Sequence, residues 1–335
     1  MLILRWLGLV AAGLFGLVAI LLGAAALATL VISLRVAARF PAEGPFVAVG
    51  GGRLAYLEAG PREAPRGTVV LLHGASANSA DPMEGVGRRL AAQGFRVLAF
   101  DRPGFGWSDR LTGAAMASPG PQGEAIAEAL ERLGVGPAIV LGHSWAGALA
   151  ARIALDHPQR VSGLVLVSPA ALPFPAERVL PWYWRLAVSP PVTWLLTRTV
   201  APVIGLYYLP RAGRAVFAPQ EPVPDYVERS RAALVLRPGT ALANIQDLVG
   251  LGPALKEQAP RYPGLRVPTT VVAGEADPIV RTASQAAPLA AMIPGARLVV
   301  LPGIGHMVQY VAAEAVAAEV GALADRIAAP ATNGR

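Results

Sequence analysis

Six short runs of consecutive apolar residues recur along the chain and constrain its fold more than any other feature. They are rich in Val, Ile and Leu, and they lie at Val69 to Leu72, Arg96 to Phe100, Ala138 to Leu141, Leu164 to Val167, Thr270 to Ala273 and Leu298 to Leu301. A strand that is buried on one face alternates apolar and polar residues, whereas a strand that is buried on both faces is apolar throughout. The runs therefore predict strands in a sheet that is covered on both sides.

Segments with helical spacing separate most of these runs. They are Glu84 to Gln93, Glu124 to Leu133, Trp145 to Asp156, Ala283 to Met292 and Val311 to Ile327. Strands and helices in alternation predict an α/β fold with a doubly wound, mostly parallel sheet. Before the first run, "FVAVGGGRLAYLEAG" contains two short β-type stretches around Gly50-Gly51-Gly52, which is typical of a hairpin.

The alternation is interrupted once, between Ala171 and Tyr262, where the chain becomes rich in proline and aromatic residues. Later in this segment, helical spacing is visible around Tyr226 to Leu236 and Ala241 to Leu248. We interpret residues 172–262 as a helical cap domain that is inserted into a core formed by residues 46–171 and 263–328. With 335 residues, of which 54% are hydrophobic, the chain is long enough to bury such a core.

The N-terminal segment contains no charged residue from Trp6 to Leu34. This run exceeds the roughly 20 residues that a helix needs to cross a bilayer. Arg5 and the A-x-A site Ala26-Leu27-Ala28 would also fit a cleaved signal peptide. The apolar run continues past that site and is long for a signal peptide, so its length favours a single-pass membrane anchor in residues 1–40. Basic residues on both flanks leave the membrane face weakly defined, with a slight preference for a cytoplasmic catalytic domain.

The charged residues and the absence of cysteine exclude several kinds of site and partner. Without cysteine the chain has no disulfide, no thiolate nucleophile and no zinc–thiolate site. The net charge is +7, but there is one lysine and no basic run of five or more residues. We therefore expect membrane lipid as a partner in preference to nucleic acid. We expect no metal and no cofactor.

Chemically useful residues follow directly after the predicted strands. His73-Gly74-Ala75 follows the first run, Asp101 the second and "GHSWAG" the third, and Asp277 and His306 follow the last two. Because ligands bind outside the carboxyl ends of strands in an open parallel sheet, these residues should lie near one another. Asp101 and its neighbour Arg102 are expected to form a local pair that holds the turn.

Ser144 is placed at the joint between a strand and a helix, where it could be a nucleophile or only a helix N-cap. A sharp turn of this kind needs small neighbours, which Gly142, Ala146 and Gly147 provide. The N–H of Trp145 would then face a developing oxyanion, and a second donor is expected from Ala75.

A serine nucleophile needs a base that is oriented by a carboxylate. Of the four histidines, His73 and His143 lie in the turns themselves and His157 follows a helix, which leaves His306 in a glycine-rich loop. His73 has no carboxylate or thiol cluster nearby, so we expect it to shape the oxyanion loop together with Gly74. Each motif also has a purely structural interpretation: Asp277-Pro278 could simply begin a helix, and Gly305-His306 could be an ordinary loop.

The chain from residue 46 to 328 resembles the α/β-hydrolase superfamily in "LLHGASAN", "DRPGFGWSD", "GHSWAG", "AGEADPIV" and "PGIGHM". The resemblance implies that Ser144 is the nucleophile, His306 the general base and acid, and Asp277 the residue that orients His306. One departure is Ala146, where the second glycine of G-x-S-x-G is commoner. Serine at position 144 argues against the members that open epoxides or displace halide, which use aspartate there.

The triad alone does not separate esterases and lipases from thioesterases, carbon–carbon bond hydrolases or cofactor-free haloperoxidases and perhydrolases. A non-catalytic ligand-binding protein with the same scaffold is the alternative of another class. The predicted cap favours an apolar acyl ester, because it contributes aromatic residues that could cover the site or face a membrane, namely Trp182, Tyr183, Trp184, Trp194, Tyr207 and Tyr208. The competing interpretation is that these aromatics only pack the cap on the sheet.

Overall fold

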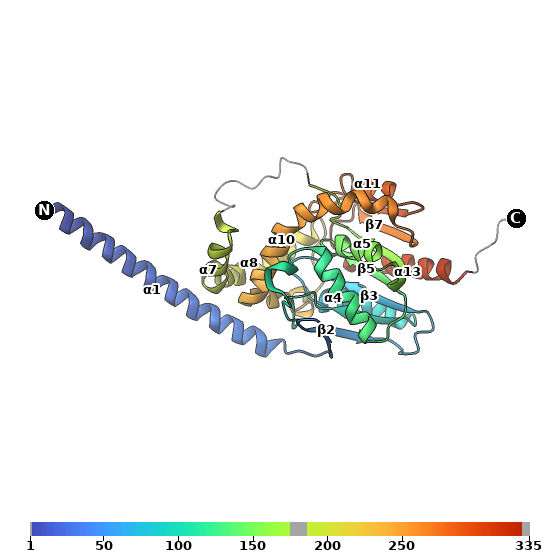
Figure 1. The fold of residues 1–335 in the computed structure, drawn as a ribbon, viewed down its shortest axis with the longest axis horizontal. Helices are drawn as coiled ribbons and strands as arrows, with labels where there is room; N and C mark the ends of the chain where they lie inside the picture. Colours follow the sequence, from blue (N-terminus) through green and yellow to red (C-terminus); the bar gives the residue numbers. More distant parts are fainter. Residues whose placement is uncertain (1, 175–185, 330–335) are drawn as a thin grey trace.

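The fold was determined from a computed structural model, which describes residues 2–174 and 186–329 (Figure 1). Its centre is an eight-stranded sheet with the strand order β1-β2-β4-β3-β5-β6-β7-β8. Strands β3 to β8 are parallel, whereas β2 runs antiparallel to both β1 and β4. The strands are β1 (Phe46–Val49), β2 (Gly52–Ala59), β3 (Thr68–Leu72), β4 (Arg96–Phe100), β5 (Ala138–His143), β6 (Val161–Val167), β7 (Thr269–Gly274) and β8 (Arg297–Leu301).

Both faces of the sheet are buried along β3 to β7, as the continuous apolar runs predicted, but the prediction is wrong for Leu298 to Leu301, because β8 is the edge strand and is largely exposed. Along β3, Val69 and Leu71 pack into one hydrophobic cluster and Val70 and Leu72 into the other. The first cluster includes side chains of α13, and the second includes side chains of α4 and α5. The core helices are α2 (Ala80–Pro82), η1 (Met83–Gly87), α3 (Arg88–Ala92), α4 (Pro119–Arg132), α5 (Ala146–Asp156), α11 (Ala286–Met292), α12 (Val308–Val311) and α13 (Ala313–Ala328), with short turns η2 (Gly113–Met116) and η3 (Pro158–Arg160).

The described residues between β6 and β7 are mostly helical. It contains α7 (Pro190–Arg198), α8 (Val200–Phe217), α9 (Tyr226–Arg229), η5 (Ala232–Leu236), α10 (Pro238–Gln258) and η6 (Ala259–Gly264). These elements lie at one end of the sheet, between the core and the N-terminal helix (Figure 1). Trp182, Tyr183 and Trp184, which we assigned to the cap, fall outside the described residues.

The N-terminal helix α1 (Leu2–Arg39) extends away from the rest of the chain (Figure 1). Its best 18-residue window has a mean hydropathy of 2.6, so α1 is long and apolar enough to span a membrane. A signal sequence near the N-terminus has the same composition. The last part of α1 packs on the cap, where Thr29 and Val36 are buried. Trp107 Nε1 donates to the carbonyl of Phe40, which follows α1, at 3.1 Å.

Candidate active site

Ser144 occupies a strained turn between β5 and α5. Its φ is 55°, a left-handed conformation that costs a residue with a side chain about 1–2 kcal/mol. The neighbouring glycines are required by close approaches: a Cβ on Gly142 would lie 2.2 Å from the carbonyl oxygen of Ala146, and one on Gly147 would lie 2.5 Å from Pro169 Cβ. The small residues therefore allow a tight strand-to-helix turn that presents the hydroxyl.

Backbone hydrogen bonds hold this turn in place. The Ser144 amide donates to the carbonyl of Val167 at 3.0 Å. The Ser144 carbonyl accepts from the amides of Gly147 at 2.8 Å and Ala170 at 3.0 Å. The strained backbone is thus fixed by the adjoining strand β6 and by its own helix, as is common where strain persists at functional sites.

His306 and Asp277 form a buried pair. His306 Nδ1 lies 2.7 Å from Asp277 Oδ2, with 5% and 0% of their side chains exposed. Because the carboxylate accepts a hydrogen bond, Nδ1 carries the hydrogen and donates it, so the other ring nitrogen, Nε2, is available as a base. The loops that carry the two residues are in close contact, since a Cβ on Gly274 would lie 2.2 Å from the carbonyl oxygen of Ile304.

Asp277 also stabilises its own turn. Its Oδ1 accepts the amides of Ile279 and Val280, each at 2.8 Å. The alternative interpretation of Asp277-Pro278 as a helix start is wrong, because the next helix, α11, begins only at Ala286; Oδ1 holds a local turn instead, while Oδ2 faces His306. The local bonds fix the direction in which Oδ2 faces the imidazole.

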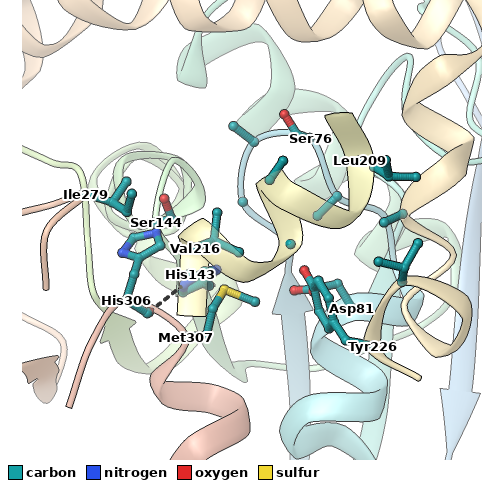
Figure 2. A pocket seen from close by; sticks show the side chains of 17 residues that line it. Ser76, Asp81, His143, Ser144, Leu209, Val216, Tyr226, Ile279, His306 and Met307 are labelled. Atoms are coloured by element: carbon teal, nitrogen blue, oxygen red, sulfur yellow. Dashed lines mark hydrogen bonds between the residues drawn. The ribbon is translucent and has the colours of Figure 1, made fainter. Parts of the chain in front are cut away.

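Ser144 and His306 line the same pocket, which has a volume of about 210 Å³ (Figure 2). The floor is formed by the loop from Gly74 to Ala77 and by the turn at His143 and Ser144. Helix α8 of the cap contributes an apolar wall with helical spacing, formed by Leu209, Ala212, Gly213 and Val216. The structure thus brings the serine and the histidine to one cavity beneath the cap.

Of the two residues whose amides were expected as oxyanion donors, Ala75 lines this pocket, and Trp145 directly follows the lining residue Ser144. A Cβ on Gly74 would lie 3.1 Å from Ser144 Cβ, so the loop after β3 is packed directly on the serine turn. Among the described residues, neither the amide of Ala75 nor that of Trp145 donates to a protein acceptor. Neither of these N–H groups is committed to a protein acceptor, which is what an oxyanion donor requires.

His73 and His143 support the two turns. His73 Nε2 accepts the amide of Arg102 at 3.0 Å, and its Nδ1 lies 2.8 Å from the carbonyl of Gly74. Burial, and the charge of Arg102, hold the pKa of His73 well below its usual range. His143 Nε2 lies 3.2 Å from the carbonyl of His306, and burial together with the His306 charge lowers its pKa in the same way. Both rings are neutral and connect the oxyanion loop and the His306 loop to the sheet.

The expected pair of Asp101 with Arg102 is wrong. Asp101 does hold the turn after its strand, through the amides of Ser79 and Trp107, each at 2.7 Å. Arg102, in contrast, is fully buried and pairs with Asp247 of α10, with 2.6 Å between Nη1 and Oδ2. Sequence adjacency suggested the wrong partner, because the true one lies 145 residues away.

Arg102 connects the cap to the catalytic turns. Its Nε donates to the carbonyl of His73 at 3.0 Å, and its guanidinium lies 4.1 Å from the centre of the Trp145 ring. Trp145 Nε1 donates to the carbonyl of Asp247 at 3.0 Å. Burial lowers the pKa of Arg102 to about 10, so it stays charged at neutral pH. The sequence contained no sign of this network, apart from the position of Arg102 after a strand.

Asp81 is a second pocket residue that the sequence did not indicate. It faces the cavity from the side opposite Ser144, next to Tyr226 (Figure 2). Tyr226 donates its hydroxyl to Asp81 Oδ1 at 3.2 Å, and Tyr310 donates to the Asp81 carbonyl at 2.8 Å. Burial raises the pKa of Asp81 to about 6, although hydrogen bonds from Tyr226 and Gln309 oppose the shift.

Comparison with known proteins places these features in context. The sequence model of a family described as having the alpha/beta hydrolase fold matches residues 67–313. A dihydrolipoyllysine-residue acetyltransferase component of an acetoin cleaving system from Cupriavidus necator is 30% identical over 272 residues, which cover 79% of this chain. The match spans 64% of that protein, less than two thirds of its length.

Two further matches cover a larger share of the matched proteins. A monoacylglycerol lipase from Mycolicibacterium smegmatis is 28% identical over 260 residues, covering 72% of this chain and 81% of the lipase. The crystal structure of a membrane phospholipase A, described as a bacterial virulence factor, has a TM-score of 0.65 at 24% identity and covers 96% of this chain and 98% of its own. At that identity the structural match shows a shared fold.

Proposed function

The chain belongs to the α/β-hydrolase fold family, and we propose that it is a serine hydrolase that cleaves carboxylic ester bonds of apolar, lipid-like substrates. The observation that carries the proposal is the buried pair of His306 and Asp277, 2.7 Å apart, in the pocket that also contains Ser144. Three side chains from distant parts of the sequence supply a hydroxyl, a base and the carboxylate that orients it.

In the proposed reaction, His306 Nε2 removes the proton of the Ser144 hydroxyl as its oxygen attacks the ester carbonyl. The oxyanion that forms is bound by the amides of Ala75 and Trp145. His306 then gives the proton to the departing alcohol, which leaves an acyl group on Ser144. Water activated by His306 releases the acid and restores the serine. Asp277 keeps Nδ1 protonated and stabilises the imidazolium.

The substrate class is inferred from the walls of the pocket. Most residues that line it are apolar or glycine, including the face of α8 that points inward. Such a cavity favours an acyl chain over a sugar or a peptide. The relative that is named a monoacylglycerol lipase supports a glyceride or a similar lipid ester, and α1 would hold the enzyme close to such substrates.

The test is turnover of p-nitrophenyl esters of increasing acyl length by the full-length protein in detergent. We expect activity that rises from acetyl to medium-length chains and is lost after labelling with a fluorophosphonate, which reacts with activated serines. If the probe does not label the protein and no ester is cleaved, the proposal is wrong and the scaffold only binds its ligand. Cleavage of a carbon–carbon bond in a vinylogous diketone, with no ester cleavage, would instead favour the carbon–carbon hydrolase chemistry.

A further inference from the structure

Helix α1 is divided into a bare half and a packed half. From Leu2 to Leu21 the side chains are exposed, apart from the half-buried Gly16. This part has about 20 residues and is about 30 Å long, which is the thickness of the hydrocarbon layer of a bilayer. Beyond Leu21, one side of the helix is covered by the cap, and Thr29 is 2% exposed. The packing on the cap therefore begins about one bilayer thickness from the N-terminal end of α1.

The cap elements at this level are α7 and α8. The Thr29 hydroxyl donates to the carbonyl of Thr199, which joins the two helices, and Arg39 pairs with Glu228 of α9. Thr29 is about eight residues beyond Leu21, so Thr199 lies at a height of about 12 Å above the hydrocarbon layer if α1 is perpendicular to it. Figure 1 shows α7 and α8 on the side of the cap that faces the bare half of α1.

This side of the cap exposes large apolar side chains. We define the cap apolar face as five residues of α7 and α8 that are 41–64% exposed: Trp194, Leu195, Ile204, Tyr207 and Tyr208. Outside α1 and the cap, the exposed large apolar side chains of the described residues are Ile279, Leu298 and Val300, at 38–40%. Single exposed apolar residues are normal, whereas a cluster of large ones marks an interaction surface. The interpretation that these aromatics pack the cap on the sheet is therefore wrong for Trp194, Tyr207 and Tyr208.

The charges on this face fit a lipid surface. From Pro190 to Phe217 there is no acidic residue, but there are three arginines. The Arg198 guanidinium lies 4.4 Å from the centre of the Trp194 ring, and that of Arg211 lies 4.6 Å from the Tyr207 ring. Aromatic rings and arginines together are typical of the layer between hydrocarbon and headgroups, and each arginine adds attraction to anionic lipid.

Helix α8 has two apolar sides, which relate this face to the pocket. Leu209, Gly213 and Val216 line the cavity that contains Ser144. Ile204 and Tyr208, one turn apart, are 50% and 54% exposed on the outer surface. A single helix, about 10 Å in diameter, therefore separates the outer apolar surface from the catalytic cavity.

We propose that the cap apolar face is a second membrane-binding surface, which inserts into the interfacial layer of the bilayer beside α1 and prefers anionic lipid. The bilayer is favoured over a protein partner because the face adjoins the helix that would span the membrane and is basic as well as apolar. If the proposed ester hydrolysis is correct, a further consequence is that the substrate is an ester taken from the membrane itself.

The first experiment uses the absence of native cysteine. Full-length protein with the single change Ile204→Cys or Tyr208→Cys is labelled with the fluorophore NBD and reconstituted in phosphatidylcholine vesicles. We expect a blue-shifted emission that lipids with a nitroxide near the headgroup end of the acyl chain quench. The control is Glu131→Cys on α4, whose native side chain is 68% exposed, and its label should remain in water without quenching.

Two outcomes would overturn the proposal. Labels on α8 that behave like the label at position 131 would show that the face stays in water. Labels that are shielded but not quenched by lipid, with crosslinked dimers between cysteines at position 204, would show that a second copy covers the face. Adding phosphatidylglycerol should increase the quenching, and Arg211→Gln should reduce that increase; equal quenching in both lipids would exclude the anionic preference.

The second experiment links the surface to turnover. Ile204→Glu should lower the hydrolysis of a long-chain ester embedded in vesicles by roughly tenfold, but leave a short soluble ester unaffected. The matched control is Leu298→Glu on β8, which places the same charge at a partly exposed apolar position, 38% exposed, without effect on either substrate. If the α8 labels are quenched by lipid but the protein reacts with no ester and no fluorophosphonate, the surface stands and only the proposed hydrolysis fails.

Discussion

Arg102 of the core and Asp247 of the cap form an ion pair in which neither side chain is exposed to solvent. The same carboxylate accepts from Arg110 through Oδ1 at 2.7 Å and from Gln122 through Oδ2 at 2.9 Å. Since Arg102 also contacts the carbonyl of His73 and the ring of Trp145, the pair connects the cap to the loop after β3 and to the turn after β5.

Removal of the charge at Asp247 should therefore destabilise the fold. We expect Asp247→Asn to lower the free energy of unfolding by about 3–5 kcal/mol, because it leaves Arg102 charged and unpaired in the interior. Thermal unfolding in detergent measures the change. As a control, Asp325→Asn at the Arg66 pair, where Asp325 is 74% exposed, should cost less than about 1 kcal/mol. Equal effects of the two substitutions would show that the buried network has no special role.

The proposed triad predicts a graded loss of activity. Ser144→Ala and His306→Ala should each lower kcat by about 10⁶-fold, and Asp277→Asn by about 10⁴-fold. The smaller loss for Asp277→Asn is expected because the imidazole is still present but is no longer held in the right tautomer. Steady-state hydrolysis of a p-nitrophenyl ester measures all three, and circular dichroism checks that the variants are folded. Folded Ser144→Ala with substantial activity would contradict the assigned nucleophile.

Asp81 predicts how stability depends on pH. Its pKa rises from 3.8 to about 6 on folding, so between these values the unfolded chain has lost a proton that the folded chain retains. Stability therefore falls as the pH rises from about 4 to 6, by up to about 3 kcal/mol, and the loss persists at higher pH. Asp81→Asn should remove this dependence.

The measurement is the difference in unfolding free energy between Asp81→Asn and the unmodified chain from pH 4 to pH 8. As the pH rises, the unfolding free energy of Asp81→Asn should increase relative to that of the unmodified chain by up to about 3 kcal/mol. Above about pH 7 the difference should be constant. Asp325→Asn is the control for loss of an exposed carboxylate, and its difference should change little. A constant difference for Asp81→Asn at all pH values would show that Asp81 is not a buried acid with a raised pKa.

The serine turn predicts a sharp contrast between two glycines. Gly142→Ala would place Cβ 2.2 Å from the carbonyl oxygen of Ala146, so we expect a loss of about 3 kcal/mol and very low activity. Gly136→Ala meets no atom within 4 Å and has no left-handed backbone, and it should leave stability unchanged or raise it by about 0.5 kcal/mol. Expression level and thermal unfolding compare the two variants. Normal stability of Gly142→Ala would contradict the tight packing.

The sheet could be predicted because local pattern and tertiary environment agree in its strands. The predicted strand Arg96 to Phe100 is β4 without change, and the run from Thr270 to Ala273 lies within β7 (Thr269–Gly274). The region predicted as a helix from Glu84 to Gln93 is correct in kind, but helical structure begins earlier, at Ala80, and passes through η1. Helix ends depend on caps and packing, which an apolar pattern does not encode.

The candidate site was predicted only where residues follow strands directly. Ser144, Asp277 and His306 belong to this group, because the topology of a parallel sheet brings the ends of its strands together. Asp81 and Asp247 do not, since one lies in a short helical turn and the other in the middle of α10. Their positions depend on how the cap packs on the core, and no periodic signal in the sequence reports that packing.

The left-handed backbone of Ser144 has a consequence for evolution and for engineering. Glycine at this position would relieve the strain and make a protein that is easier to fold but has no hydroxyl. Selection for stability therefore favours glycine at this position, whereas selection for catalytic activity favours serine. If the proposed role of Ser144 is correct, homologues that no longer need the enzymatic activity should replace this serine early in their evolution and keep the rest of the fold.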